Sequence, residues 1–306
     1  MPLAIRFDSY GDPDVLRVAE VAPLTAGPGQ VRLAVRAAGV NPVDHKILSG
    51  AMRGMMPLDL PGGLGSDVAG VVDQVGAGVS AFGVGDEVLG ASLTPAYAQS
   101  ALADPAALVA KPASVPWEVA GTLAGTGITA WEVLGKLRVS AGETLLVHAA
   151  AGGVGTFAVQ LAVARGVRVI GTAAERNHAR LRDLGAEPVT YGAGLADRVR
   201  ALSPQGVDAV LDASGRGEIP DSIALAGGPE RVLSLVAFDA ADTGIQLHMG
   251  EPGAGRPEAL AEILALIEAG RLRVPVAGTY PLSEVSAALE VSRSGHPGGK
   301  LVVLPG

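Results

Sequence analysis

The residues best suited to chemistry stand in one stretch, where an apolar run is followed by small residues at fixed spacing. Residues 145–147 are Leu, Leu and Val, a run typical of a strand buried on both faces. Ala149, Gly152 and Gly155 follow at three-residue intervals. Small residues there let the backbone turn sharply and approach a pyrophosphate, and a helix beginning near Val154 would point its free N–H groups at the phosphates. The stretch predicts a dinucleotide-binding turn, although a tight turn without a ligand gives the same pattern.

The next strand of this unit, predicted over Val167–Thr172, ends without a carboxylate. An acid at that point accepts hydrogen bonds from the ribose 2′-hydroxyl of NAD and repels the 2′-phosphate of NADP. Ala173-Ala174 occupies the position and Arg176 follows, with a guanidinium able to pair a phosphate. The pattern favours NADPH. Two alternatives stay open: a strand end shifted by one or two residues would make Glu175 the ribose ligand, and Arg176 and Arg180 could form an exposed helix face.

Composition limits the classes of protein to consider. A chain of 306 residues predicts about two domains, and 48% hydrophobic with 18% charged residues indicates a packed core. The net charge of −8 comes without any acidic or basic block, which argues against a nucleic-acid partner. The absence of cysteine excludes disulfides, thiolate nucleophiles and cysteine-ligated zinc. The N-terminus resembles no signal peptide and no apolar run reaches membrane-spanning length, so a cytoplasmic protein is expected.

Residues 1–117 are predicted to form an all-β domain shaped as a partly closed barrel. Alternation at 31–35 predicts an antiparallel strand with one wet face, and the apolar run at 68–76 predicts a central strand whose glycines mark bends or close backbone approach. The strand candidates, separated by Gly/Pro turns, are Leu3–Phe7, Leu16–Val21, Gln30–Ala38, Ala69–Val75 and Glu87–Ala91.

From about residue 117 helices and strands alternate, which predicts a doubly wound parallel sheet, an α/β fold. A helix is predicted over 117–137, with a break around Gly125–Gly127. The further strands are Val167–Thr172, Pro188–Tyr191, Val207–Asp212 and Arg231–Val236, and the helices Arg176–Leu184, Ala196–Leu202, Ile219–Ala226 and Pro257–Ala269. The tail, with strands at Thr279–Leu282 and Lys300–Leu304 and a helix at Ser283–Arg293, could complete either the sheet or the barrel.

Seven motifs in a fixed order resemble one family over essentially the whole chain, the zinc-independent quinone oxidoreductases of the medium-chain dehydrogenase/reductase superfamily. The motifs are Gly39–Asp44, Gly65–Val72, Gly85–Val88, Gly127–Trp131, Ala149–Gly155, Leu184–Ala186 and Gly295–Lys300. The resemblance implies a GroES-like, partly open β-barrel domain over 1–117 and about 272–306. It implies a Rossmann NADPH-binding domain over 118–271, with the active site in the cleft between the two.

The resemblance also implies a reaction without metal. Zinc-dependent relatives carry a cysteine where Asn41 stands and a His-Glu pair where Ser66-Asp67 stands, and no cysteine exists here. Neither zinc site of those relatives can form, so alcohol oxidation is not expected. The implied reaction is hydride transfer from NADPH to a quinone or to the β-carbon of an α,β-unsaturated carbonyl.

Roles follow from the resemblance position by position. Asn41 and Thr129 match positions beside the nicotinamide and substrate; Asn41 could steady a developing oxygen anion, or could be a turn residue before Pro42. Tyr191 would flank the 2′-phosphate or be a half-buried strand residue, and Lys300 would lie near the cofactor or be solvated. The cofactor-binding residues implied are Ala149, Gly152, Gly153, Val154, Gly155, Thr172, Arg176, Tyr191, Ser234, Val236 and Lys300.

Other residues and functions are weighed against this interpretation. His148, at the end of an apolar strand, is expected to be a hydrogen-bonded core histidine, and Asp44 to serve a turn. A homodimer is expected through a sheet edge formed by Arg231–Phe238 and Gly244–Met249. The alternatives to a quinone or enone reductase are an NADPH-binding redox sensor or partner-binding protein without catalysis, and an enoyl-thioester reductase.

Overall fold

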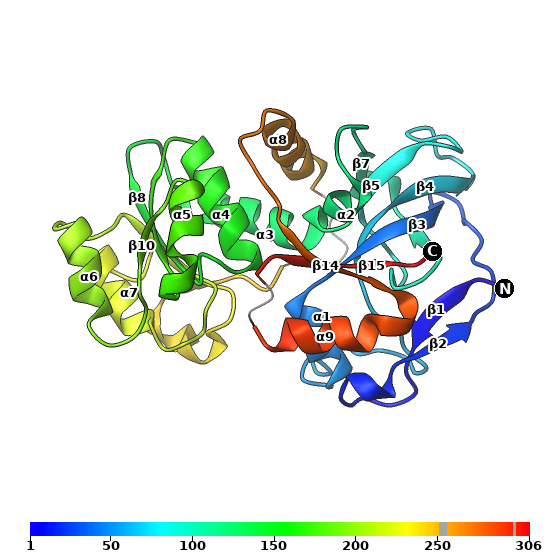
Figure 1. Cartoon of the computed structure of the whole chain (residues 1–306), viewed down its shortest axis with the longest axis horizontal. Coiled ribbons are helices and arrows are strands. Elements are labelled where there is room, and N and C mark those ends of the chain that lie inside the picture. The colour runs from blue at the N-terminus through cyan, green and yellow to red at the C-terminus, as the bar shows by residue number, and fades with distance from the viewer. Residues whose placement is uncertain (251–255, 296–297) are drawn as a thin grey trace. The chain divides into compact units, whose positions relative to one another are not determined.

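The computed structural model describes residues 1–250, 256–295 and 298–306 (Figure 1). The chain forms two compact units, one of Met1–Ile128 with Pro252–Gly306 and one of Thr129–Glu251. The domain boundaries expected from the sequence, at 117 and 272, stay a prediction. His296 and Pro297 of the last family motif lie outside the described residues.

The first unit is built on a seven-stranded sheet in the order β14-β15-β3-β4-β5-β7, with β6 paired to β3, beside a β1–β2 pair. Its strands are β1 Leu3–Arg6, β2 Arg17–Glu20, β3 Val31–Val40, β4 Asp67–Val75, β5 Glu87–Ala91, β6 Ser100–Ala103, β7 Leu108–Ala110, β14 Val276–Pro281 and β15 Lys300–Leu304. Its helices are η1 Pro13–Val15, α1 Pro42–Leu48, η2 Pro105–Ala107, α2 Trp117–Ala120, α8 Pro257–Glu268, η5 Leu282–Glu284 and α9 Val285–Arg293.

Strand β4 lies in the middle of this sheet, as predicted, beside the long strand β3. They pair antiparallel, with Leu33 opposite Val72, and Leu33 is fully buried. A Cβ on Gly70 of β4 would lie 2.4 Å from the carbonyl oxygen of Ala34, so this glycine permits a close backbone approach. The C-terminal strand β15 pairs antiparallel with β3, and α9 packs against β14 and β15 (Figure 1). The tail therefore completes the barrel-like sheet.

The helix break predicted around Gly125–Gly127 is wrong. The chain leaves helical geometry after α2 and resumes it in α3, Leu123–Leu137, which runs through all three residues. A Cβ on Gly125 would lie 2.7 Å from Oδ1 of Asp67, so this position needs a glycine for close packing. The sequence displays the glycine, but it does not display the carboxylate that packs against it.

The second unit holds a six-stranded parallel sheet in the order β10-β9-β8-β11-β12-β13, which confirms the predicted Rossmann architecture. Figure 1 shows α6 and α7 on one side of β8 and β10, and α4 and α5 on the other. The elements are β8 Thr144–His148, α4 Gly153–Ala164, β9 Arg168–Thr172, η3 Glu175–Asn177, α5 His178–Asp183, β10 Glu187–Val189, α6 Leu195–Leu202, β11 Ala209–Asp212, α7 Ile219–Ala226, β12 Val232–Ser234, η4 Phe238–Thr243 and β13 Gln246–Leu247.

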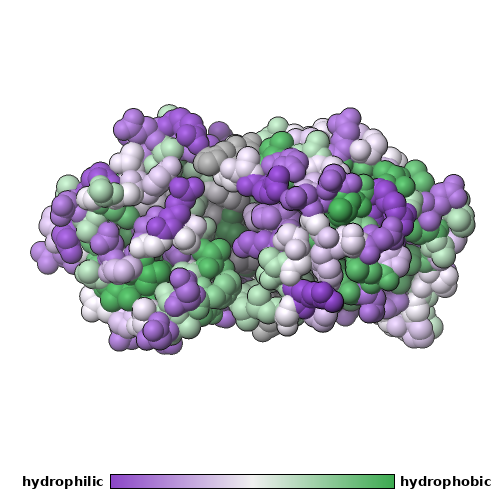
Figure 2. All heavy atoms as spheres, turned by 90° about the horizontal axis from the view of Figure 1, so that it is seen from below, coloured by the Kyte–Doolittle hydropathy of each residue, from purple (hydrophilic) through white to green (hydrophobic). Residues whose placement is uncertain are grey.

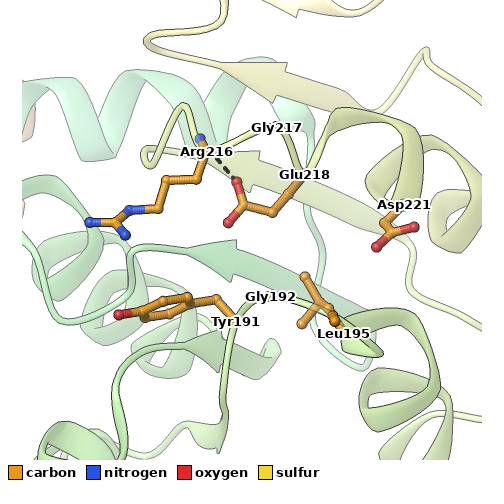
Figure 3. Close-up of a pocket in the computed structure, with 8 residues that line it drawn as sticks. Tyr191, Gly192, Leu195, Arg216, Gly217, Glu218 and Asp221 are labelled. Carbon is orange, nitrogen blue, oxygen red and sulfur yellow. Dashed lines mark hydrogen bonds between the residues drawn. The ribbon is translucent and has the colours of Figure 1, made fainter.

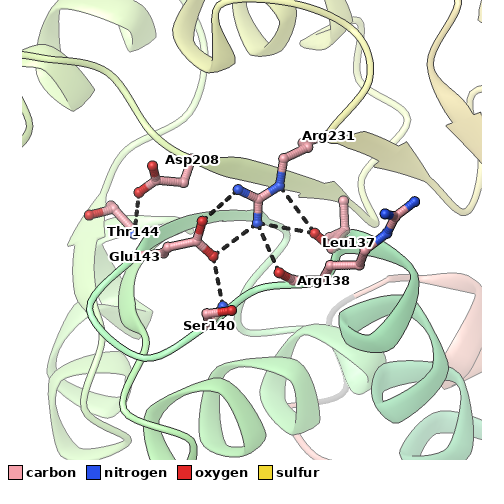
Figure 4. A network of polar contacts seen from close by, with 7 residues as sticks. All are labelled: Leu137, Arg138, Ser140, Glu143, Thr144, Asp208 and Arg231. Carbon is pink, nitrogen blue, oxygen red and sulfur yellow. Dashed lines mark hydrogen bonds and ion pairs between the residues drawn. The ribbon is translucent and has the colours of Figure 1, made fainter.

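An ionic network holds the amino edge of this sheet (Figure 4). The guanidinium of Arg231, just before β12, pairs with both carboxylate oxygens of Glu143 at 2.6 and 2.9 Å. It also donates to the carbonyl oxygens of Leu137 and Arg138, where α3 ends. This pairing lowers the pKa of Glu143 to about 2. The network therefore fixes the entry into β8, the strand that leads to the glycine turn.

The surface carries no continuous hydrophobic band on the face shown in Figure 2, where hydrophobic residues lie in small groups among hydrophilic ones. Among the described residues, no helix is both long and apolar enough to span a membrane.

Candidate functional site

The glycine turn between β8 and α4 has the geometry that its spacing predicts. Ala149 adopts the left-handed conformation, with φ +52°, and its carbonyl oxygen accepts a hydrogen bond from the Gly152 N–H at 2.8 Å. The helix α4 begins directly afterwards at Gly153. The first N–H groups of a helix lack partners within it, so those of Gly153, Val154 and Gly155 form an anion-binding end.

The glycines of the turn serve different purposes. A Cβ on Gly155 would lie 2.3 Å from the carbonyl oxygen of Ala149, so the helix can pack on the turn only if this residue is glycine. A Cβ on Gly152 would lie 3.1 Å from the same oxygen, a tight contact that the protein itself does not forbid. Gly152 and Gly153 are exposed. Gly155 is thus required by the fold, and the Gly152–Gly153 pair leaves the turn open to a ligand.

Thr172, predicted to contact the cofactor, is buried and supports the glycine turn through hydrogen bonds. Its hydroxyl accepts a hydrogen bond from the Ala149 N–H at 3.2 Å, and its carbonyl oxygen accepts one from the Ala150 N–H at 3.0 Å. His148 is fully buried with Nε2 2.9 Å from the Ser222 hydroxyl, and burial lowers its pKa. The prediction of a hydrogen-bonded core histidine is therefore confirmed.

Strand β9 ends at Thr172, as predicted, so the shift that would turn Glu175 into a ribose ligand does not occur. Arg176 lies in η3 and is exposed, with no hydrogen bond or ion pair of its guanidinium among the described residues. Arg180 is half-buried and donates to the Thr156 hydroxyl at 3.0 Å. The two arginines therefore have different surroundings, although both lie near the end of β9.

Tyr191 lies two residues after β10 and is 38% exposed, so it belongs to the loop and not to a half-buried strand. It lines a pocket that also contains Arg216, a residue that the sequence interpretation missed (Figure 3). The only signal for Arg216 is its place in a Gly-Arg-Gly sequence soon after the strand Ala209–Asp212.

The segment after β12 satisfies its own N–H groups. The Ser234 hydroxyl donates to Asp212 at 2.7 Å and accepts from the N–H groups of Val236 and Ala237 at 3.1 and 2.9 Å. The Leu235 N–H is bonded to the Asp212 carbonyl oxygen. The Ser234 side chain is fully buried, so it shapes this segment from inside the protein and is not itself exposed to a ligand.

In the first unit, Asn41 and Lys300 form a buried pair. The Lys300 Nζ donates to Oδ1 of Asn41 at 2.6 Å and lies 3.4 Å from the Val40 carbonyl oxygen. Lys300 is only 6% exposed, so the alternative of a solvated lysine is wrong. Asn41 is also the N-cap of α1, where its N–H donates to Asp44 at 2.7 Å. Asn41 therefore begins a helix instead of standing in a turn, and this role coexists with the bond to lysine.

Two buried carboxylates flank this pair. Asp44 accepts a hydrogen bond from the Tyr97 hydroxyl at 2.8 Å, and burial raises its pKa to about 6. Burial also raises the pKa of Asp67, which accepts hydrogen bonds from the Asn41 side chain and the Gly125 N–H, and it lowers the pKa of Lys300. The cluster therefore holds two acids and one base away from water. Tyr97 was missed, since it carries no motif.

These partners fix the orientation of the Asn41 amide. Lysine is only a donor and a carboxylate only an acceptor, so Oδ1 must face Lys300 and Nδ2 must face Asp67. The amide oxygen is occupied, and the NH₂ group has a second hydrogen to offer. Thr129, the other predicted catalytic residue, is half-buried on α3 and belongs to the second unit.

Comparisons with known proteins agree over the whole chain. The model of the alcohol dehydrogenase GroES-like domain matches residues 27–202, and that of a zinc-binding dehydrogenase matches residues 184–303. A quinone oxidoreductase of Pseudomonas aeruginosa is 33% identical, with all of both chains covered. The structure of Escherichia coli quinone oxidoreductase complexed with NADPH is 27% identical, with a TM-score of 0.88 over 99% of this chain and 100% of that one. The CurK enoyl reductase structure is 25% identical, with a TM-score of 0.88 over 99% of both chains.

The residues around Asn41 do not fit the zinc ion that the second family description names. The Lys300 ammonium lies 2.6 Å from the Asn41 oxygen, so a cation already occupies the position where a metal would need to bind that atom. The described residues contain no group of three or more His, Cys, Asp or Glu side chains placed to hold a metal ion. By contrast, the open Gly152–Gly153 turn and the start of α4 fit a nicotinamide dinucleotide.

Proposed function

Since the chain belongs to the quinone oxidoreductase-like family of the medium-chain dehydrogenases/reductases, we propose that it reduces a quinone or an α,β-unsaturated carbonyl with NADPH. When bound, this cofactor supplies the hydride. The observation that carries the proposal is the exposed Gly152–Gly153 turn at the start of α4, beside a strand that is followed by two alanines instead of an acid. The lack of a carboxylate there and the exposed Arg176 favour NADPH over NADH.

Asn41 is proposed to act as a hydrogen-bond donor to the substrate. Its oxygen is bound by Lys300 and one amide hydrogen goes to Asp67, so the other hydrogen is the group it can offer. A donor aimed at an oxygen that gains negative charge stabilises the transition state more than the ground state. The hydrogen bond from the ammonium polarises the amide and strengthens that donor.

The segment after β12 is proposed to contact the nicotinamide through its backbone. The N–H groups of Leu235, Val236 and Ala237 already have acceptors inside the protein, so the carbonyl oxygens are the groups left for this contact. A carbonyl can accept from the NH₂ of the nicotinamide carboxamide, which orients the ring. Thr129 is proposed to border the same ring.

A spectrophotometric NADPH-oxidation screen over quinones and enones, with NADH as the comparator, tests the function. Gly152→Val places a bulky side chain on the exposed turn and should abolish turnover while the protein stays folded; normal activity would refute the cofactor assignment. Arg176→Ala should raise the KM for NADPH much more than for NADH. Equal effects on both cofactors would remove Arg176 from 2′-phosphate binding.

A second candidate is reduction of an enoyl thioester, because an enoyl reductase shares 25% identity and the full fold with this chain. It differs from the first candidate in needing room for a pantetheine arm. Crotonyl-CoA in the same screen separates the two, since turnover of the thioester with none of quinones or simple enones would favour it. Tight NADPH binding without oxidation by any acceptor would instead indicate a non-catalytic sensor.

The protein is proposed to form a homodimer through the edge of the parallel sheet. Strand β13, Gln246–Leu247, is the last strand on that edge, and Met249 beside it is 68% exposed. An exposed strand edge with apolar neighbours pairs readily with a second copy. Light scattering after gel filtration tests this. Leu247→Pro, which removes the backbone N–H of β13 that faces away from β12, should shift a dimer toward monomer, and an unchanged mass would exclude this edge.

A further inference from the structure

A pocket of about 370 Å³ opens at the carboxyl edge of the parallel sheet, entirely within the second unit (Figure 3). The loops that follow β10 and β11 form its two walls, and β9 and β8 lie between those strands in the sheet. Crevices outside the carboxyl ends of parallel strands are where doubly wound folds bind ligands. The pocket is lined by Tyr191, Gly192, Ala193, Leu195, Arg216, Gly217, Glu218 and Asp221.

Arg216 and Tyr191 face each other at one end of this pocket. The guanidinium carbon lies 5.2 Å from the centre of the tyrosine ring, which is within range of a cation–π contact. In Figure 3 the guanidinium and the tyrosine hydroxyl point the same way, at the end opposite Asp221. Among the described residues the guanidinium makes no hydrogen bond or ion pair, so its N–H groups are available to an anion.

The loop that carries Arg216 is held by hydrogen bonds of its own. The Asp212 carboxylate accepts from the N–H groups of Ser214 and Gly215 at 2.9 and 3.2 Å. Glu218 accepts from the Arg216 N–H at 3.1 Å. Gly215 adopts a positive φ of +63°, which lets the chain make this tight turn. Arg216 therefore projects from a fixed backbone.

The loop that carries Tyr191 is fixed in a similar way by one side chain. The Arg198 guanidinium donates to the carbonyl oxygens of Thr190 and Ala193 at 3.0 and 2.8 Å, and to those of Tyr191 and Gly192 at 3.3 and 3.1 Å. These bonds close the turn between β10 and α6. Both walls of the pocket are therefore ordered before any ligand arrives, which reduces the entropy lost on binding.

The charges of the pocket indicate the kind of ligand. One end offers a guanidinium and a phenolic hydroxyl, which suit an anion, and the other end has the Asp221 carboxylate, which suits an N–H donor. The Glu218 carboxylate between them accepts hydrogen bonds from the Ser214 hydroxyl and the Arg216 N–H. An adenosine that bears a phosphate has both groups, an anion at the ribose and an amino group on the purine. The polarity thus matches the adenosine half of a phosphorylated dinucleotide.

We propose that Arg216, together with Tyr191, binds the adenosine 2′-phosphate and is the main determinant of NADPH over NADH in this chain. The proposal rests on the proposed function and names a residue for it. Both arginines are exposed, and neither guanidinium has a hydrogen bond or ion pair among the described residues, but Arg216 alone of the two is held against an aromatic ring on an ordered loop. A prearranged guanidinium loses less side-chain freedom on binding a phosphate, so Arg216 contributes more than Arg176.

Isothermal titration with two nucleotides that lack the nicotinamide tests the proposal without any turnover. Adenosine 2′,5′-bisphosphate carries the 2′-phosphate, and 5′-AMP does not. Arg216→Ala should weaken the bisphosphate roughly 10- to 100-fold, the range for a lost hydrogen-bonded charge, and should change 5′-AMP less than about twofold. The affinity of Arg216→Lys for the bisphosphate should lie between those of the wild type and Arg216→Ala, because lysine keeps the charge and loses the planar pairing. Arg200→Ala, an exposed arginine on α6 outside the pocket lining, is the matched control and should change neither.

Four results overturn the proposal. An equal loss of both nucleotides in Arg216→Ala would mean that the residue serves the adenosine or the loop, and unchanged affinities would remove it from the site. A larger selective loss in Arg176→Ala would assign the 2′-phosphate to that residue. A wild type that binds both nucleotides equally would overturn the NADPH preference itself. A selective loss in a protein that reduces none of the acceptors supports Arg216 and refutes only the reductase activity.

Discussion

The two units use polar groups in opposite ways. Around Asn41 in the first unit, Asp44, Asp67 and Lys300 are each no more than 6% exposed and bind one another or nearby groups. In the second unit, the Gly152–Gly153 turn and the Arg216 guanidinium are presented to solvent or to a pocket. The first arrangement fixes one amide at the expense of burying charge. The second keeps backbone and cationic groups free for a phosphorylated ligand.

Removal of Lys300 should have the largest effect, because it leaves two buried carboxylates without a cation. Lys300→Met is expected to lower the free energy of unfolding by about 3–5 kcal/mol at pH 8, the usual consequence of breaking a buried charge pair. The loss should shrink at pH 5, because Asp44, with its pKa raised to about 6, takes up a proton there. Urea unfolding at both pH values measures it, with the exposed Arg36→Met as the control for loss of a cation.

The same variant also tests the cofactor contact predicted for Lys300. If the ammonium serves Asn41, the folded fraction of Lys300→Met should bind NADPH with nearly wild-type affinity and show a lower kcat. A loss of NADPH affinity of tenfold or more would instead place the ammonium at the cofactor.

Protonation of Asp44 should make the stability of the first unit depend on pH. Its pKa is raised from the ordinary 3.8 to about 6, so between these values the folded state holds a proton that the unfolded chain has lost. The free energy of unfolding therefore falls as the pH rises from about 4 to about 6, by at most about 3 kcal/mol, and levels off above.

Asp44→Asn keeps an oxygen that can accept from the Asn41 N–H and the Tyr97 hydroxyl, and it should flatten that slope. Urea midpoints across pH 4–8 give the comparison, with the exposed Asp59→Asn as the control. Asp67, whose pKa is also raised, will leave a residual slope. Parallel profiles for wild type and Asp44→Asn would show that Asp44 is ionised throughout.

The smallest predicted effect distinguishes, within the glycine turn, the glycine that the fold requires from the glycine that ligand binding requires. Gly155→Ala should lower the free energy of unfolding by about 1–3 kcal/mol, because its Cβ would lie 2.3 Å from a backbone oxygen. Gly152→Ala should cost less than about 1 kcal/mol and should chiefly weaken NADPH binding. Thermal unfolding and a cofactor titration on both variants check this. Equal losses of stability would mean that Gly152 is also a packing residue.

Much of the fold follows from local sequence patterns, since periodicity and turn residues act over short distances. The strand Glu87–Ala91 and the helix Ile219–Ala226 have the bounds that the sequence predicts. Strands β6 and β7 were missed because they have four and three residues and are held by pairing with β3 and β5. Short segments of this kind depend on partners that are distant in the sequence.

The candidate site was predictable where backbone geometry defines it and much less so where side chains do. The Ala149–Gly155 spacing specified the turn, because only small residues allow it. In the sequence Lys300 is a lone lysine at the start of a strand. Its partner Asn41 is 259 residues away, so no local pattern reveals the contact. Arg216 was missed for the same reason, since its contact with Tyr191 depends on how two loops meet.

The Arg231–Glu143 network has a consequence for how this protein can be altered. It braces the amino edge of the parallel sheet, whereas the glycine turn and the Arg216 pocket lie at the carboxyl edge. Substitutions that strengthen or weaken the brace should therefore change heat tolerance and leave cofactor choice alone, and changes at Arg216 should do the reverse. Evolution or engineering can then change thermal stability and cofactor preference separately, because the residues that determine them lie at opposite ends of the same strands.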